Sequence, residues 1–392
     1  MKSLLTLLLA LCLAVAIASA SFEPVRDGHS RAAGRTFHFH NNCSFPVWFG
    51  LVSGAVPNGR CSAGCPQGSY CNPQNGICYF NQPKPANGDF RLSPNGGSNS
   101  VVFPYYNNGL NVVWSGALAG RTGCESGTCQ TADCGPNPDH ESCAHGFGQP
   151  ATQGEFTMLT NNIDTYDVEV INGINIPLAI NPLTSARTND PFFCGNPGAL
   201  RPRTPTGSCS WDLSPPSPHY VWVTQDGRGC SSDRECSGGE VCGLSTPLTL
   251  NCGKRLGYWT ADQVCGMNSN YGAPFDCAQY SRLYGCTNGI DSCYQPFATS
   301  TCCGCANWQD LGVPVPSSVT RCHAINPTWV KNVQPKLLWM KKACPTSYTY
   351  PYDDMSSTFT CSEMVGGLNR VDYEVVFCPP AGDCTPRVVV NF

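Results

Sequence analysis

The abundance of cysteine is the strongest structural signal in this chain, since 28 of its 392 residues are cysteines. One of them, Cys12, lies in an apolar stretch over residues 4–20 that follows Lys2 and ends in Ala18-Ser19-Ala20. A basic start, a short apolar stretch and small residues at its end are typical of a secretory signal peptide rather than of a membrane anchor. We therefore expect residues 1–20 to be removed and the protein to be secreted and extracellular.

Clustered cysteines have two common explanations, disulfides and zinc sites. Thiols oxidise in the secretory pathway, whereas clustered thiolate ligands for zinc are typical of the cytosol. The irregular spacing of these cysteines also disfavours zinc. We expect a disulfide framework, with no metal and no cofactor, and we expect that part of the chain lacks a sizeable core and depends on crosslinks.

Composition excludes several classes of partner. Charged residues make up only 13% of the chain, while it contains 40 glycines and 33 prolines, so turns must be many and long amphipathic helices few. A formal charge of −4 gives no reason to expect nucleic acid or an anionic membrane as partner. A second apolar run long enough to cross a bilayer is missing, so we expect the mature protein to be soluble. We also expect it to be a monomer.

The cysteines are unevenly distributed, and this maps the chain. Residues 79–123 and 144–193 contain none, and both have strand-like runs. In Tyr166-Asp167-Val168-Glu169-Val170 the alternation of apolar and polar residues is strict, which predicts a strand with one buried and one wet face. Residues 372–377 show a similar pattern. The start, middle and end of the chain therefore supply strands to one all-β body, whereas residues 194–344 contain fifteen cysteines and few alternating runs.

Several motifs together resemble one known family. Gly120-Arg121-Thr122-Gly123-Cys124, followed by residues 129–134, resembles the signature of the thaumatin-like, pathogenesis-related family 5 proteins. Glu125 stands where that signature usually has glycine. Further matches follow in the same order at residues 150–157, 166–168, 172–177, 344–361 and 373–379.

The resemblance implies a fold and a set of disulfides. The fold is all-β: a flattened β-sandwich, a disulfide-rich loop domain and a small C-terminal hairpin domain. The implied pairs are Cys43 with Cys378, Cys124 with Cys129, Cys134 with Cys143, Cys194 with Cys361, and Cys209 with Cys344. Four cysteines at 61–78 would pair among themselves, as would twelve at 230–322, which leaves Cys384 over as a free thiol or an intermolecular link.

These expectations divide the chain into segments. They are a signal peptide (1–20), a sandwich core (37–193) with a cysteine-rich insertion (61–78), a disulfide-rich middle domain (194–344), a small hairpin domain (345–360), closing sandwich strands (361–380) and a tail (381–392).

The resemblance also implies a function in an acidic cleft between the sandwich and the middle domain. Proteins of this kind often bind β-1,3-glucan, and some hydrolyse it weakly. Cleavage of a glycosidic bond needs a protonated carboxylic acid and a carboxylate. Glu155 matches as the candidate general acid, and Asp167 matches as the base or nucleophile.

Departures from the family pattern affect this cleft. Ala117 stands where the family usually has an arginine, and Asn172 stands where it has an aspartate. Pro335 occupies the position of the family's aspartate in the middle domain. Because only one pair of carboxyl groups is left in the cleft, the pKa of the general acid should be raised less strongly than in a larger cluster. Asn172 could bond a sugar hydroxyl but could not transfer a proton.

Other interpretations of these acids remain open. Glu155 and Asp167 could simply be surface or ion-paired acids on strands, and Asp133, Asp164 and Glu169 lie in the same matching stretches. We expect Asp353 and Asp354 to form a turn by side-chain-to-backbone bonds.

Aromatic and histidine side chains add weaker signals. Tyr105 and Tyr106 occur in turn-rich sequence and could stack on sugars, as could Tyr258, Trp259, Tyr271 and Tyr294; filling small cores is the commoner role of such rings. His38 and His40 have metal-ligand spacing without an evident third ligand. Asn42-Cys43-Ser44 is an N-glycosylation sequon, but the neighbouring cysteine disfavours its use.

Two classes of function follow. The first is a secreted β-1,3-glucan-binding protein in defence or wall remodelling, with weak or absent endo-β-1,3-glucanase activity. The alternative is a non-catalytic structural or interaction protein of a wall or extracellular matrix.

Overall fold

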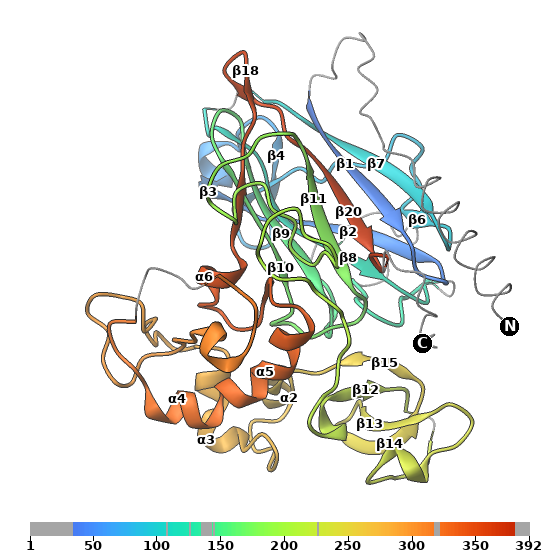
Figure 1. Ribbon diagram of the computed structural model, residues 1–392. Coiled ribbons are helices and arrows are strands. Elements are labelled where there is room, and N and C mark those ends of the chain that lie inside the picture. The colour runs from blue at the N-terminus through green and yellow to red at the C-terminus, as the bar shows by residue number, and fades with distance from the viewer. Residues whose placement is uncertain are drawn as a thin grey trace, which may run out of the picture.

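Two β-sheets stacked face to face form the larger part of the molecule (Figure 1). The computed structural model describes residues 34–380 except 107–108, 125–126, 135–142, 144–145, 226 and 317–321. The expected signal peptide, Glu125, Cys384 and the tail lie outside the described residues.

The smaller sheet of the sandwich has the order β11-β20-β1-β7. Its strands are β1 (Gly34–Asn41), β7 (Gly97–Pro104), β11 (Leu178–Leu183) and β20 (Asp372–Phe377). β1 runs parallel to β20 and antiparallel to β7. The start, middle and end of the chain thus meet in one sheet, as the alternating patterns predict.

The larger sheet has the order β16-β10-β9-β8-β2-β6, with β17 also paired to β10. Its strands are β2 (Val47–Ser53), β6 (Arg91–Leu92), β8 (Val112–Arg121), β9 (Gln153–Leu159), β10 (Asp164–Glu169), β16 (Ser347–Tyr348) and β17 (Phe359–Cys361). The expected all-β sandwich is confirmed.

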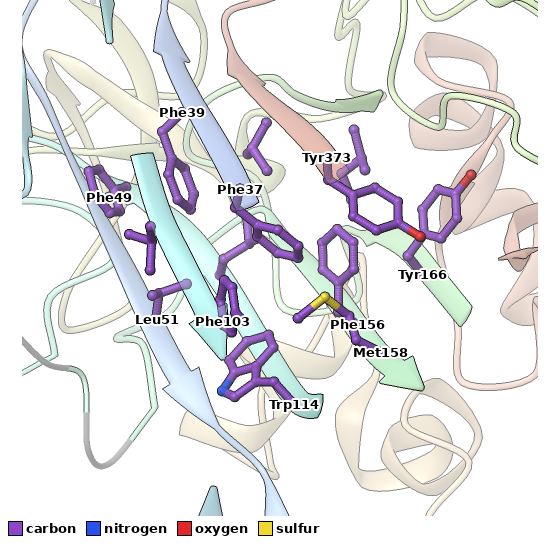
Figure 2. Packing of buried hydrophobic residues seen from close by; sticks show 14 of the residues in the cluster. Phe37, Phe39, Phe49, Leu51, Phe103, Trp114, Phe156, Met158, Tyr166 and Tyr373 are labelled. Atoms are coloured by element: carbon purple, nitrogen blue, oxygen red, sulfur yellow. The ribbon is translucent and has the colours of Figure 1, made fainter. Parts of the chain in front are cut away.

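Aromatic side chains fill the space between the two sheets (Figure 2). Every second residue of β1 is buried, which places Phe37 and Phe39 inside. The ring of Phe39 stacks on that of Phe49 with centroids 4.1 Å apart, and Phe37 lies 4.6 Å from Phe156. Alternation along each strand therefore decides which residues form this core and which remain on the outer faces.

One buried ion pair crosses this core. The Asp164 carboxylate on β10 accepts hydrogen bonds from the Arg35 guanidinium on β1 and from the Tyr373 hydroxyl on β20, the latter at 2.7 Å. Both members of the pair are fully buried. Because these side chains come from both sheets, the pair fixes how the sheets are placed relative to each other.

Three smaller sheets lie outside the sandwich. The insertion forms β3 (Ala55–Arg60), β4 (Ser69–Asn72) and β5 (Ile77–Phe80), and the middle region forms β12 (Val221–Val223), β13 (Val241–Ser245), β14 (Thr249–Gly253) and β15 (Arg255–Tyr258). A hairpin of β18 (Met364–Val365) and β19 (Leu368–Asn369) precedes β20.

Short helices form the rest of the middle region, on one side below the sandwich in Figure 1. They are α2 (Ala261–Met267), α3 (Cys277–Tyr284), α4 (Pro327–Asn332), α5 (Gln334–Ala343) and, just beyond it, α6 (Asp354–Ser357). No described helix is long and apolar enough to cross a membrane.

The middle region has a hydrophobic core of its own, which corrects the expectation of a part that depends on crosslinks alone. Trp329 and Tyr350 are buried with ring centroids 5.1 Å apart, and Val264 and Phe275 are fully buried in the same cluster. Tyr258 and Trp259 also belong to this core, which leaves them unable to serve as exposed sugar platforms.

The small hairpin expected at residues 345–360 lies elsewhere in the chain. That segment instead holds β16 and α6 and leads into β17, and both of these strands pair with β10 of the large sheet. The observed hairpin follows at residues 364–369, where Gly366 and Gly367 adopt positive φ in the turn.

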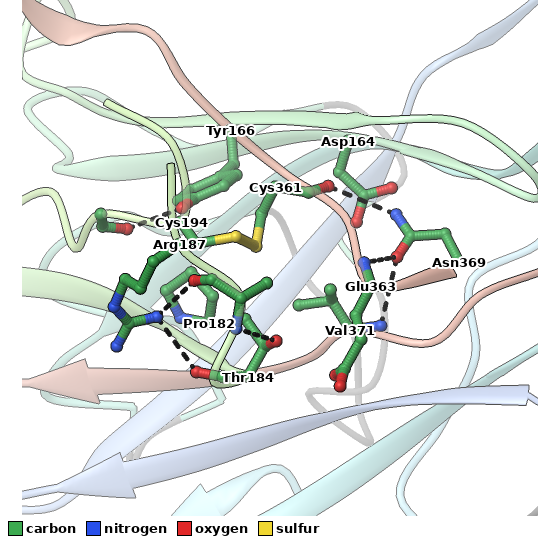
Figure 3. Close-up of a disulfide and its surroundings, with 12 residues drawn as sticks. Asp164, Tyr166, Pro182, Thr184, Arg187, Cys194, Cys361, Glu363, Asn369 and Val371 are labelled. Atoms are coloured by element: carbon green, nitrogen blue, oxygen red, sulfur yellow. Dashed lines mark hydrogen bonds between the residues drawn. A yellow bond between two sulfur atoms is a disulfide. The ribbon is translucent and has the colours of Figure 1, made fainter. Parts of the chain in front are cut away.

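The structure contains the five disulfides that the resemblance implies, among them Cys43 with Cys378. Figure 3 shows another of them, Cys194 with Cys361. The insertion pairs Cys61 with Cys71 and Cys65 with Cys78. The middle region pairs Cys230 with Cys242, Cys236 with Cys252, Cys265 with Cys277, Cys286 with Cys303, Cys293 with Cys302, and Cys305 with Cys322.

Candidate functional site

The outer face of the large sheet carries both candidate acids. Along β9, Phe156 and Met158 point into the core, while Glu155 and Thr157 are exposed (Figure 2). The period of two that buries the aromatic residues therefore presents the carboxylate and the hydroxyl on the opposite side of the same strand.

Strand register lines up four side chains across this face. Val52 of β2 is paired with Ala117 of β8, Ala117 with Glu155 of β9, and Glu155 with Asp167 of β10. Neighbouring strands lie about 4.8 Å apart, so the carboxyl groups of Glu155 and Asp167 are adjacent. The pair expected from sequence is thus brought together by the structure.

A second row, of hydroxyl groups, runs beside the first. Ser115 is paired with Thr157 and Thr157 with Thr165, and the hydroxyls of Ser115 and Thr157 lie 3.2 Å apart. The two rows line an open cavity of about 430 Å³. Its walls are formed by Val52, Ser53, Gly54, Ser115, Gly116, Ala117, Glu155, Phe156, Thr157, Thr165 and Asp167.

Glu169 is the functional candidate to which sequence reasoning gave no role. It lies two residues after Asp167 on the same side of β10, and only 6% of it is exposed. The charge of Glu155 acts on its carboxyl group, so the two acids lie close together. The i, i+2 spacing to Asp167 was the signal that could have identified it.

Burial and charge raise the pKa values of two of these acids. The pKa of Asp167 lies well above its ordinary value, mainly because of burial and further because of the nearby charges of Glu155 and Asp354. The pKa of Glu169 is also raised, first by burial and then by the charge and hydrogen bond of Glu155. A raised pKa favours the protonated form of Asp167, whereas a base or nucleophile must be ionised.

Asn172 has a different role from the one expected. Its amide group donates to the Glu169 carboxylate, and its Oδ1 accepts from Gln149 at 2.7 Å. Gln263 of α2 donates to the Asn172 carbonyl oxygen at 2.6 Å. The side chain of Asn172 therefore positions Glu169 and does not line the cavity, and the middle region orients it.

The structure brings together more acidic side chains than the single pair expected from the sequence. Glu155, Asp167 and Glu169 lie together, and Asp354 adds its charge while accepting a hydrogen bond from the Tyr348 hydroxyl at 2.7 Å. Asp353, in contrast, is buried and accepts hydrogen bonds from Lys341 at 2.8 Å and from the Thr349 backbone at 3.0 Å. Asp353 thus stabilises the fold, whereas Asp354 contributes to the acidic site.

No cation faces the carboxyl row in the part of the chain that the structure describes: neither lysine nor arginine lines the cavity. Ala117, which replaces the family's arginine, is paired directly with Glu155. A longer basic side chain here would reach the carboxylate. The methyl group instead leaves the cavity wider and its charge negative.

Tyr105 and Tyr106, expected to bind substrate, have packing roles elsewhere. The Tyr105 hydroxyl donates to the Asn369 carbonyl at 2.6 Å, and the Arg370 guanidinium lies 5.1 Å from the centre of its ring. The Tyr106 ring packs so closely on Gly68 that a Cβ there would come within 2.3 Å of it. Neither ring lines the acidic cavity.

Histidine and cysteine side chains are the remaining residues with a spacing suited to metal ligands. His40 lies on the outer face of β1, where its Nε2 is 3.4 Å from an oxygen of Glu374. Two described groups of cysteines have sulfur atoms within 4.8 Å of one another. All six sulfur atoms are bonded in disulfides, so they offer no thiolate to a metal.

Comparison with known proteins gives a consistent set of matches. The model of the thaumatin family matches residues 79–379. "Pathogenesis-related thaumatin-like protein 3.5" of Cryptomeria japonica is 25% identical over 90% of this chain and 93% of its own length. "Pathogenesis-related protein 5" of Arabidopsis thaliana is 26% identical over 88% of this chain and 90% of its own length. "Thaumatin-like protein 1" of Prunus persica is 26% identical over 87% of this chain and 89% of its own length. Family match, sandwich and disulfide pattern agree, and the chain belongs to the thaumatin family.

Proposed function

We propose that this protein is secreted and binds β-1,3-glucan on the acidic outer face of its large sheet, with weak or no hydrolysis of the polymer. The observation that carries the proposal is the open cavity of about 430 Å³ with a row of carboxyl groups beside a row of hydroxyl groups. A sugar offers hydroxyl groups that donate and accept, and both rows can pair with them. The relatives named pathogenesis-related support a role in defence.

The rigidity of the site favours binding. Glu155, Asp167, Ser115 and Thr157 all project from the middle of paired strands rather than from loops. Groups mounted in this way lose little conformational freedom when a ligand binds. A protonated carboxyl group, such as that of Asp167 with its raised pKa, can donate a hydrogen bond as well as accept one.

The same geometry limits catalysis. A glycosidase needs two carboxyl groups that flank the scissile bond, with one of them free to deliver its proton. Here Glu155 and Asp167 project side by side from one sheet face, and the charge of Glu155 acts on both Asp167 and Glu169. Among the described residues no lysine or arginine lines this cavity, so no cation there offsets the repulsion between the acids.

A pull-down tests the function. The purified protein is mixed with insoluble β-1,3-glucan, chitin or cellulose, and soluble laminarin is added as competitor. We expect retention on β-1,3-glucan that laminarin abolishes. Retention on none of the three polymers would refute the proposal and favour the alternative, a non-catalytic structural or interaction protein of a wall or matrix.

A further inference from the structure

The opposite face of the sandwich carries the chain's N-glycosylation sequon. Asn42-Cys43-Ser44 has the Asn-x-Ser pattern, whereas Asn326-Pro327-Thr328 has a proline in the middle position, which prevents transfer. Asn42 directly follows β1, and its backbone N–H donates to the Phe377 carbonyl at 3.0 Å. The backbone is thus fixed, while the half-buried side chain faces a groove.

The neighbouring asparagine shows the contrast. Asn41 is fully buried, its amide group donates to the Phe45 carbonyl at 2.9 Å, and its Oδ1 accepts from the Cys43 backbone at 2.9 Å. A sugar on Asn41 would break these bonds. Of the two adjacent asparagines, only Asn42 is compatible with a modification in the folded protein.

The groove beside Asn42 has a volume of about 460 Å³ and lies over the outer faces of β1, β11 and β20. It is lined by His40, Asn42, Ala179, Asn181, Asn196, Ala199, Leu200, Arg201, Arg203, Glu374, Val376, Pro379 and Pro380. Two proline rings and several aliphatic side chains are thus combined with polar groups. A pyranose ring, which has apolar faces and polar edges, requires this combination.

The polar groups of the groove are held in one orientation. The Asn196 amide donates to Asn181 at 3.0 Å, the Asn181 amide donates to Glu374 at 2.8 Å, and the other oxygen of Glu374 lies 3.4 Å from the His40 ring. Because each group fixes the next, their remaining donor and acceptor sites are preorganised. Such sites cost little entropy when they bind a sugar.

The adjacent disulfide does not prevent glycosylation, contrary to the expectation from sequence. The partner of Cys43 is Cys378, which follows 335 residues later. At about 5–20 residues per second, synthesis of that length takes roughly 20–70 s. β20, which pairs with β1, is also made last. During that interval neither the Cys43–Cys378 disulfide nor the bond from the Asn42 N–H to Phe377 can form, so Asn42 is not yet held on that side.

We infer that Asn42 carries an N-linked glycan whose first sugar rests in the groove lined by Asn181, Glu374 and Pro380. In this step the Asn42 amide nitrogen bonds to the anomeric carbon of a lipid-linked oligosaccharide. The bond to the lipid diphosphate breaks, and the amide proton passes to a base of the transferase. The inference needs passage through a secretory pathway and goes beyond glucan binding, which uses the other sheet.

Peptide mapping by mass spectrometry tests the modification on the full chain secreted from a eukaryotic host. Peptide N-glycosidase should convert Asn42 into aspartate in the wild type and leave Asn326 unchanged. Asn42→Gln and Ser44→Ala should each abolish the glycan; Ser44 is exposed, so the second variant covers a folding defect of the first. Unmodified Asn42 in the secreted wild type would overturn the inference, whatever the glucan pull-down shows.

The rate of enzymatic release tests the seating of the sugar. A seated first sugar should make release slower from the native protein than from the denatured one. Asn181→Ala should abolish this protection, whereas Asn189→Ala, an exposed asparagine outside the groove, should preserve it. Equal release rates from native and denatured wild type, or unchanged protection in Asn181→Ala, would show that the groove does not hold the sugar.

Discussion

At the residue scale, the burial of Glu169 is a property that the local sequence does not predict. Strict alternation over residues 166–170 correctly predicts a strand and places Asp167 and Glu169 on one side of it. The same pattern predicts a wet face, yet Glu169 is only 6% exposed. Asn172 bonds its carboxylate, and Tyr348 pairs with it from β16. Local alternation cannot reveal a cover supplied by residues that lie far away in the sequence.

The first prediction concerns Asn172, which donates to Glu169. Asn172→Asp removes this donor and adds a negative charge beside raised-pKa acids, so activity should not increase. The free energy of unfolding at pH 7 should fall by about 1–3 kcal/mol, as measured by urea unfolding. Asn162→Asp, the same change at an exposed position, is the control. Equal stability of the two variants would disprove the positioning role of Asn172.

The second prediction concerns pH. The folded-state pKa of Glu169 is raised above the unfolded value of about 4. The folded protein therefore binds more protons between these two values, and stability is lost as pH rises through the folded pKa. Glu169→Gln removes this contribution, so its unfolding free energy should depend less on pH and exceed that of the wild type at pH 8. Urea unfolding at pH 4 and pH 8 gives both slopes, and identical slopes would contradict the buried-acid description.

At the scale of elements, β10 organises the large sheet, since it pairs with β9, β16 and β17. The long alternating strands were predictable from sequence, because each has enough residues to show its period. β16 has only two residues, and pairing with β10 rather than local pattern defines it. The expectation of a separate hairpin at residues 345–360 came from the family resemblance, because a strand this short shows no period of its own.

The third prediction concerns the buried pair that joins the two sheets. Asp164→Ala leaves the Arg35 guanidinium and the Tyr373 hydroxyl buried without their common acceptor. We expect a loss of about 3–5 kcal/mol in the free energy of unfolding, measured by urea titration. The double variant Arg35→Met/Asp164→Leu should lose less, because it leaves no buried charge. A single variant as stable as the double would show that the pair does not link the sheets.

At the scale of the whole molecule, the cysteine distribution correctly separates a sandwich from a disulfide-rich region. It does not reveal the aromatic core around Trp329 and Tyr350, since those rings are scattered along the sequence and meet only when the helices pack. Disulfides therefore contribute most to stability in the segments that have no buried side chains. Residues 228–240 contain no buried residue and are held by the disulfides of Cys230 and Cys236.

The fourth prediction follows from that difference. After mild reduction, trypsin should cut first after Arg228 and Arg234, because a disulfide contributes roughly 2–4 kcal/mol and these loops have little else to hold them. Buried Arg121 in the sandwich should be cut late. A time course read by mass spectrometry, with unreduced protein as control, gives the order. Cleavage after Arg121 at the same rate would mean that the molecule opens as one unit.

Titration of laminarin by calorimetry tests whether the acidic face of the large sheet binds β-1,3-glucan. Thr157→Leu fills the cavity without altering a carboxyl group, and Val102→Leu enlarges an exposed side chain on the other sheet as the matched control. Thermal unfolding checks that both variants are folded. We predict that Thr157→Leu weakens binding at least about tenfold, the equivalent of 1.4 kcal/mol, while Val102→Leu binds like the wild type. Equal affinity of all three proteins would contradict the claim.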